Sequence, residues 1–98
     1  MARNGKPGYF ILLDDIEHTL LKAQQHFAEG RLAEKNECFN VFSAFCATLE
    51  RFDDIPPDRN QQILEKLRQM QSSLENESEF EDFSGKLRSL ASALGSNQ

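Results

Sequence analysis

The side chains best suited to metal or acid-base chemistry are two histidines on one expected helix. His18 and His26 lie eight residues apart, which places them about 12 Å apart along a helix axis, too far to share a metal ion. Asp14 precedes His18 by four residues, so these two side chains can meet on one helix face. Two ligands make an incomplete metal site, and a di-metal carboxylate bundle needs two Glu-x-x-His motifs, which this sequence does not contain. The pattern predicts surface histidines, with no metal and no cofactor.

The two cysteines predict neither a disulfide nor a nucleophile. Cys38 and Cys46 are eight residues apart within one expected helix. Their Cα atoms are therefore about 12 Å apart, whereas a disulfide needs a separation below about 7 Å. A reactive thiol needs exposure and a neighbour that lowers its pKa, and no sequence feature supplies either. We expect both side chains to be small buried apolar groups.

Motifs for phosphate or calcium binding are missing from the sequence. It contains no P-loop, no Gly-x-Gly-x-x-Gly and no nucleophile elbow, and the acids around Asp53 lack the spacing of a calcium loop. Five acids lie between Glu75 and Asp82. They either face solvent at a helix start, where negative charge is favoured, or dock a basic partner. We therefore predict that the protein is not an enzyme and has no catalytic site.

Composition and charge exclude further classes of partner. The chain has 98 residues and a net charge of −5, so it lacks the basic surplus that binds nucleic acid or an anionic membrane. Its longest run of large apolar residues is Phe10-Ile11-Leu12-Leu13, far short of the ~20 residues of a membrane span. No signal-peptide core is recognisable near the N-terminus. The expected location is the cytoplasm.

Apolar spacing predicts helices as the elements that carry these residues. In four segments apolar residues recur at intervals of three and four. These segments span about residues 8–29, 31–53, 58–75 and 78–94. Short connections make successive helices pack antiparallel. We expect an all-α fold, a small antiparallel four-helix bundle with the second helix at its centre, which forms a single domain over residues 1–98 with flexible ends.

Turn and capping residues set the predicted helix boundaries. Gly30 suits a left-handed stop after the first helix, and a pair of prolines ends the second. Ser78 and Glu81 have the spacing of a capping box. The apolar period is interrupted near Asn76, which favours two separate final helices. The alternative is one long bent helix.

The second predicted helix carries more apolar surface than one packing face requires. Four of the eight phenylalanines lie between residues 39 and 52, and the apolar arc spans about 160° where about 100° is usual. Either this helix is the centre of the bundle, or one flank binds a partner helix or a second copy. Val41, Phe45 and Phe52 lie toward one flank and are the candidate partner-binding residues.

Several features of the sequence resemble the flagellin export chaperones, a group of type III export chaperones. The similar positions are Leu12-Leu13-Asp14-Asp15-Ile16, Leu20, Ala23, Glu29-Gly30, Lys35-Asn36, Leu49, Asp53, Leu67, Met70 and Leu74. Leu13 and Asp15 stand where the family has Tyr and Gly, so no binding residue is carried over. The resemblance implies a small cytosolic bundle that holds the helices of an export substrate on its apolar surface and stops them from polymerising early.

The predicted function is a non-enzymatic protein-binding helical module. Its most specific form is a cytosolic export chaperone or regulator of bacterial secretion that holds a partner helix. The alternative is a self-associating structural bundle, a homodimer without a chaperone role. The expected partner is a helical segment of another protein or a second copy, and neither nucleic acid nor a membrane.

Overall fold

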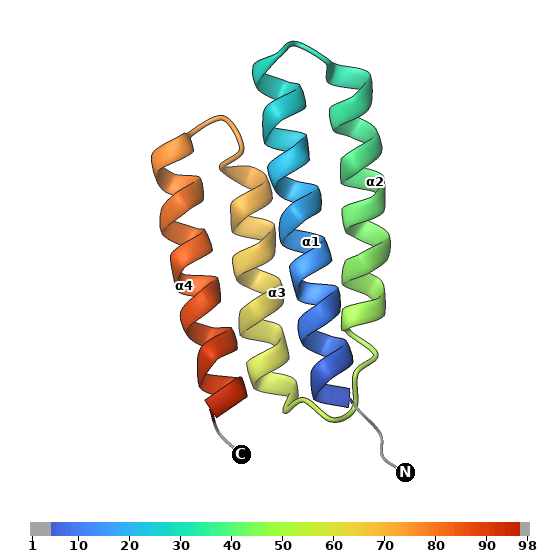
Figure 1. Cartoon of the computed structure of the whole chain (residues 1–98), viewed down its shortest axis with the longest axis vertical. Helices are drawn as coiled ribbons and strands as arrows, with labels where there is room; N and C mark the ends of the chain where they lie inside the picture. The colour runs from blue at the N-terminus through green and yellow to red at the C-terminus, as the bar shows by residue number, and fades with distance from the viewer. Residues whose placement is uncertain (1–4, 97–98) are drawn as a thin grey trace.

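Four helices follow one another along the chain in the computed structural model, which describes the backbone of residues 5–96 and the side chains of residues 8–94. They are α1 (Gly5–Ala28), α2 (Leu32–Leu49), α3 (Pro57–Ser72) and α4 (Glu77–Ser96). Figure 1 shows successive helices running in opposite directions. The predicted all-α antiparallel four-helix bundle is confirmed. No helix within the described residues has both the length and the apolar character needed to cross a membrane.

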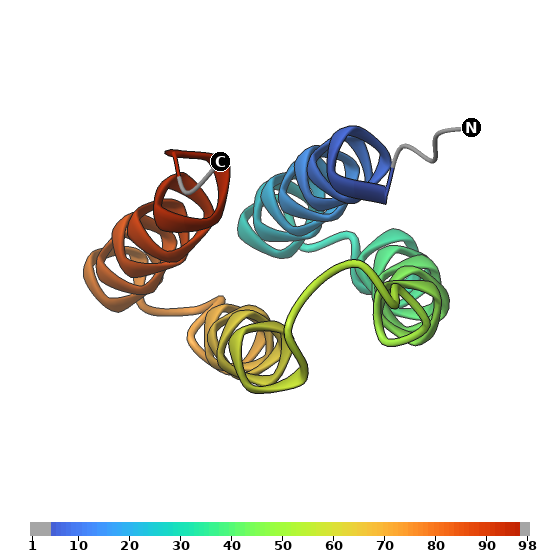
Figure 2. The same ribbon diagram turned by 90° about the horizontal axis from the view of Figure 1, so that it is seen from below.

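The bundle consists of two helical hairpins. Helix α1 packs closely on α2 and α3 packs closely on α4, while α1 also contacts α3 and so joins the hairpins. The end-on view in Figure 2 shows the first hairpin beside the second. The prediction that the second helix is central is therefore wrong, because α1 contacts a helix of each hairpin whereas α2 packs closely on α1 alone.

A single apolar core explains why α1 takes this place. Its members are Tyr9, Leu13, Ile16, Leu20, Ala23, Phe42, Cys46, Leu49, Ile55, Ile63, Leu64, Leu67, Met70, Leu74, Phe80, Leu87 and Leu94. Helix α1 contributes five of these at intervals of three and four, whereas α2 contributes three, all in its second half. Burial of each large apolar side chain contributes roughly 1.5–3 kcal/mol, so the longer stripe of α1 gives it the larger share of the packing.

The turn between α1 and α2 has the predicted glycine stop. Gly30 has φ +77°, a left-handed conformation that side chains with a Cβ avoid. Its N–H donates to the carbonyl oxygen of Phe27 (3.1 Å), and the N–H of Arg31 donates to that of His26 (2.8 Å). These two bonds satisfy carbonyls at the end of α1, and the short turn sends α2 back along α1.

Helix α2 ends at Leu49, four residues before the predicted end at residue 53. The side-chain amide of Asn60 donates to the carbonyl oxygen of Leu49 (3.0 Å), which a continuing helix would have used for the N–H of residue 53. The N–H groups of Arg51 and Phe52 instead close tight turns onto Thr48 and Leu49. Phe52 therefore lies in the loop that follows α2.

Helices α3 and α4 are separate, as the break near Asn76 predicts. The Oδ1 atom of Asn76 accepts a hydrogen bond from the N–H of Glu79 (3.1 Å), so Asn76 caps α4, which begins at Glu77. The predicted capping box at Ser78 is wrong by two residues. At the other end, α4 continues to Ser96, beyond the predicted end at residue 94; residues 97–98 of the expected flexible tail lie outside the described part of the chain.

Candidate functional site

The three predicted partner-binding residues fall in two places. Val41 is 44% exposed and Phe45 is half-buried against the core; because they are four residues apart, they lie on one face of α2. Phe52 lies at the other end of the hairpin, where its ring meets that of Tyr9 edge-on at 5.4 Å and lies against Gly8. The structure brings Val41 and Phe45 together and separates Phe52 from them.

Exposed apolar side chains gather on the first hairpin. Within the described residues, every large apolar side chain that is classed as exposed belongs to α1 or α2. They are Ile11, Leu21, Leu32 and Val41, with exposed fractions of 65%, 49%, 54% and 44%. Single exposed apolar residues are ordinary, but their restriction to one of two hairpins marks that hairpin as the less completely covered one.

The first hairpin also extends beyond the second. Figure 1 shows the α1–α2 turn lying well past the α3–α4 turn along the bundle axis. The α3–α4 turn ends beside the last turns of α1, where Leu74 and Phe27 line the same groove. Near this end of the first hairpin the rings of Phe27 and Phe39 are half-buried, and the Nζ atom of Lys35 lies 5.9 and 5.0 Å from their centroids. This cation–π contact partly covers the two rings at the projecting end.

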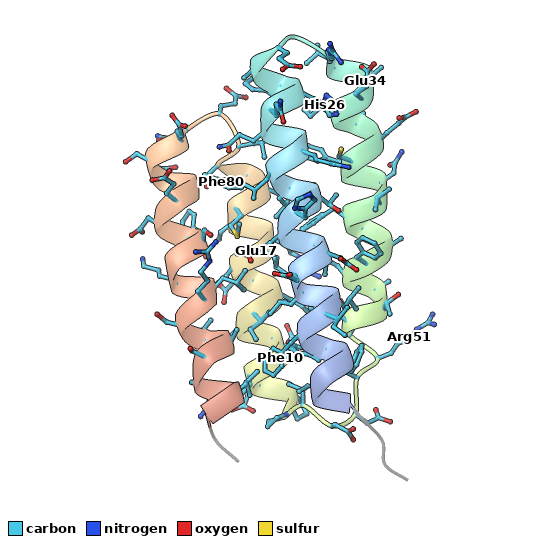
Figure 3. The ribbon with its side chains drawn as sticks, viewed as in Figure 1. Phe10, Glu17, His26, Glu34, Arg51 and Phe80 are labelled. Carbon is cyan, nitrogen blue, oxygen red and sulfur yellow. The ribbon has the colours of Figure 1, made fainter. Side chains whose placement is uncertain are left out.

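A second surface lies between α1 and α4. Leu21 lines it together with Phe80 and Gly85 of α4. Next to them Glu17 joins the two helices, since its Oε2 atom accepts a hydrogen bond from the hydroxyl of Ser84 (3.3 Å) and lies 3.6 Å from Nε of Arg88. Figure 3 shows Glu17 and Phe80 on facing helices. The sequence did not single out Leu21, because it lies outside the main apolar stripe of its helix.

The cysteines and His26, for which the sequence predicts no chemical role, lie in buried or half-buried surroundings. Cys46 is buried, and burial raises the pKa of its thiol to about 11. Cys38 is half-buried and, like Cys46, is a free thiol. The Nδ1 atom of His26 is buried without a hydrogen-bond partner. Among the described residues, no three His, Cys, Asp or Glu side chains lie in a group that suits a metal ion.

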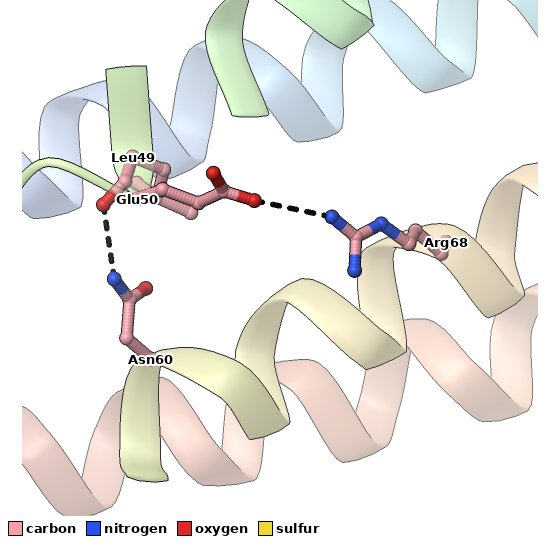
Figure 4. A network of polar contacts seen from close by, with 4 residues as sticks. All are labelled: Leu49, Glu50, Asn60 and Arg68. Carbon is pink, nitrogen blue, oxygen red and sulfur yellow. Dashed lines mark hydrogen bonds and ion pairs between the residues drawn. The ribbon is translucent and has the colours of Figure 1, made fainter. Parts of the chain in front are cut away.

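A buried polar link lies at the base of the bundle. The hydroxyl of Tyr9 donates to Oδ1 of Asn60 (2.8 Å), and Nδ2 of Asn60 donates to the carbonyl oxygen of Leu49 (3.0 Å). Figure 4 shows the second of these bonds beside the ion pair between Arg68 and Glu50. Burial raises the pKa of Tyr9 well above its ordinary value, so the phenol remains a donor. This link joins α1, the end of α2 and α3, and Asn60 also lines a surface hollow with Phe52 and Ile55.

The two surfaces of the first hairpin differ in chemistry. Val41 and Phe45 are apolar neighbours on α2, whereas between α1 and α4 the apolar Leu21 is flanked by Glu17 and Glu81. Apolar groups surrounded by polar ones are typical of interaction sites. No model of a known protein family matches this chain, and neither a curated protein nor a solved structure shows significant similarity to it.

Proposed function

We propose that this protein is a non-enzymatic protein-binding module whose first hairpin, α1–α2, binds a helix of another protein. One observation carries the proposal: the exposed large apolar side chains of the described residues all lie on this hairpin. Burial of apolar surface contributes about 25 cal/mol per Å², so a partner helix that covers these side chains gains free energy that the second hairpin does not offer.

The most specific form of the proposal is a cytoplasmic export chaperone that holds a helix of its substrate. Its support is the resemblance of residues 12–16 and of Glu29-Gly30 to the flagellin export chaperones, together with the antiparallel helical bundle that such a chaperone requires. A helix laid into an apolar groove is a recurrent mode of peptide recognition. The bound substrate helix would then be unable to pair with other copies of the substrate.

Site-specific photo-cross-linking in the organism that makes the protein tests this proposal. A photoreactive phenylalanine analogue replaces Val41, and in a control variant it replaces Ser89, which is exposed on α4. We expect an adduct with another protein from position 41 and none from position 89. Equal adducts from both positions, or none from either, would contradict the proposal.

The same experiment separates the alternative function. An adduct between two copies of the chain at position 41 would favour the self-associating structural bundle. Val41→Asp adds a test of the contact itself. Because Val41 is exposed, we expect the thermal unfolding curve to stay unchanged. A photoreactive residue placed at the neighbouring Ala44 should then no longer form the adduct. Ser89→Asp introduces the same charge on α4 and serves as the control that keeps the adduct.

A further inference from the structure

A groove follows α1 on the side that faces α4 and the α3–α4 turn. Three adjoining hollows form it, and Leu21 lines all of them. The groove begins beside Asp14 near the middle of α1 and ends beside Ala28 at its last turn. It stays open because α1 and α4 are not a closely packed pair: each packs mainly on its own hairpin partner, as the end-on view in Figure 2 also shows.

From Leu21 to the α3–α4 turn the groove has an apolar floor with room for side chains, whereas toward Asp14 the lining is charged apart from Leu21. Leu21 is 49% exposed at its centre, with Phe80 on the α4 side and Phe27 and Leu74 toward the α3–α4 turn. Opposite Leu21 the chain has Gly85, where an added Cβ would meet no atom within 4 Å. The hollows around Leu21 measure about 350 Å³ each, close to the lower limit of about 300 Å³ for ligand pockets. This space suits individual large side chains.

The rims of the groove are acidic. The acids that line it are Asp14, Asp15, Glu17, Glu75, Glu77 and Glu81. Among the lining side chains Arg88 is the one Lys or Arg, and it pairs with Glu17; His18 lines the groove as well. None of the ion pairs within the described residues neutralises the other five acids. The groove therefore carries a surplus of negative charge around an apolar floor.

Helix capping explains only part of this charge. Glu77 lies in the first turn of α4, where a carboxylate is favoured by the helix dipole. Asp14 and Asp15 lie well inside α1, which begins at Gly5, so the dipole of neither helix end accounts for them.

We propose that the groove binds one amphipathic helix with basic flanks. The apolar stripe of such a helix would cover Leu21, and its Lys and Arg side chains would pair with the acidic rims, since complementary charge sets the register and partner choice of an interface. The distance from Asp14 to Ala28 is about 21 Å along α1, which fits about four turns of partner helix. The inference rests on the proposed function and adds a second binding surface on the first hairpin, separate from Val41, together with the charge of the helix that it binds.

Binding of a synthetic peptide tests the inference directly. The probe is a labelled peptide of about 14 residues with leucines at helical spacing and lysines elsewhere, and the control peptide has glutamates in place of the lysines. Fluorescence anisotropy is measured on the full chain. We expect the lysine peptide to bind with an affinity that falls as salt is added, and the glutamate peptide not to bind. Equal binding of both peptides, or of neither, would overturn the inference.

Variants at Gly85 test whether the groove is the site. Gly85→Phe fills the space opposite Leu21 and should weaken binding by about tenfold or more, whereas Gly85→Ala leaves the space open and should bind as wild type. Both replacements favour the helical conformation over glycine, and circular dichroism checks that each variant folds. If Gly85→Phe is misfolded, Leu21→Gln replaces it, because its exposed side chain can change without disturbing the core. If folded Gly85→Phe, or Leu21→Gln in its place, binds the lysine peptide as tightly as the wild type does, the inference is overturned.

Charge variants separate the groove from general attraction to an acidic protein. Glu77→Gln with Glu81→Gln removes two rim charges, and Asp53→Asn with Asp54→Asn removes two exposed charges in the α2–α3 loop. We expect only the first pair to weaken binding of the lysine peptide. An equal effect of both pairs, or a change from dimer to monomer as the main effect of Leu21→Gln, would overturn the inference. Cross-linking at Val41 tests the proposed function separately. If Val41 forms an adduct but the lysine peptide does not bind, the groove inference is overturned and the proposed function stands.

Discussion

At the scale of single residues, Asn60 holds the base of the bundle together. It is 6% exposed, and its side chain bonds the hydroxyl of Tyr9 on α1 and the carbonyl of Leu49 at the end of α2. A buried polar group without a partner costs about 1–3 kcal/mol, so three groups on three helices depend on one another. The sequence shows Asn60 only as a polar residue near a helix start, because both of its partners are distant along the chain.

Replacement of Asn60 should therefore be costly. Asn60→Ala leaves the Tyr9 hydroxyl and the Leu49 carbonyl without partners, and we expect it to lower the free energy of unfolding by about 2–4 kcal/mol. Urea unfolding measures this change. In a double-mutant cycle, Tyr9→Phe should cost less in the Asn60→Ala background than in the wild type, because the shared bond is already lost. Strictly additive effects would show that the two residues do not interact.

Burial of Cys46 predicts low thiol reactivity. Its pKa rises from 9.0 to about 11, so at about pH 8 the folded protein holds roughly 100-fold less thiolate than the unfolded chain. Cys38→Ser leaves Cys46 as the single thiol, and its alkylation by iodoacetamide should be slow in buffer and fast in urea. Cys46→Ser, which keeps the half-buried Cys38, is the control and should react faster in buffer. Similar rates for the two folded variants would contradict the prediction.

The same pKa shift gives stability a defined dependence on pH. Because the folded state holds the thiol protonated, the unfolded state loses its proton first as the pH rises. The contribution of Cys46 to stability is therefore full below pH 9.0 and is lost between pH 9.0 and about 11. The unfolding midpoint of the wild type should fall as the pH rises from 9.0 to about 11. In Cys46→Ser the midpoint should fall less over the same range, because the thiol is absent.

At the scale of helices, local stop and cap residues decide where each element ends. Gly30 closes α1 and Asn76 opens α4 through hydrogen bonds to groups within a few residues. Such signals are readable from sequence. The sequence alone does not decide between Asn76 and Ser78 as the cap of α4, since both residue types cap helices well and both precede acids.

A pair of alanine variants distinguishes these two caps. Asn76→Ala removes the bond to the N–H of Glu79 and should lower the free energy of unfolding by about 1 kcal/mol. Ser78→Ala changes an exposed position in the first turn of α4 and should have little effect. Thermal unfolding of both variants measures the difference. A larger loss for Ser78→Ala would place the functional cap where the sequence pattern predicts it.

At the scale of the whole molecule, the two hairpins depend on each other through one core. Helix α1 contacts α3, and Tyr9 bonds Asn60 across the same boundary. Small domains with a continuous core usually unfold in one step. The hairpins are therefore expected to unfold together, although each has its own close internal packing.

Tyr9 provides a probe of this cooperativity. It is the only tyrosine, and the chain has no tryptophan, so ultraviolet fluorescence reports on the contact between the hairpins. Far-ultraviolet circular dichroism reports on all four helices. We expect the two signals to follow the same urea transition within error. Earlier loss of the Tyr9 signal would show that the hairpins separate before their helices unfold.

The sequence by itself determined the four helices, their antiparallel order and the Gly30 turn, because helical periodicity and turn chemistry act over a few residues. It also identified the apolar excess of the second helix, of which Val41 remains exposed. The end of α2, the central place of α1 and the groove at Leu21 came only from the tertiary structure. Each depends on groups far apart in the chain: the amide that Asn60 gives to Leu49, the length of the buried stripe on α1, and the offset between two hairpins. Local patterns show which side chains are apolar, but only the packing of the hairpins decides which of them the chain covers.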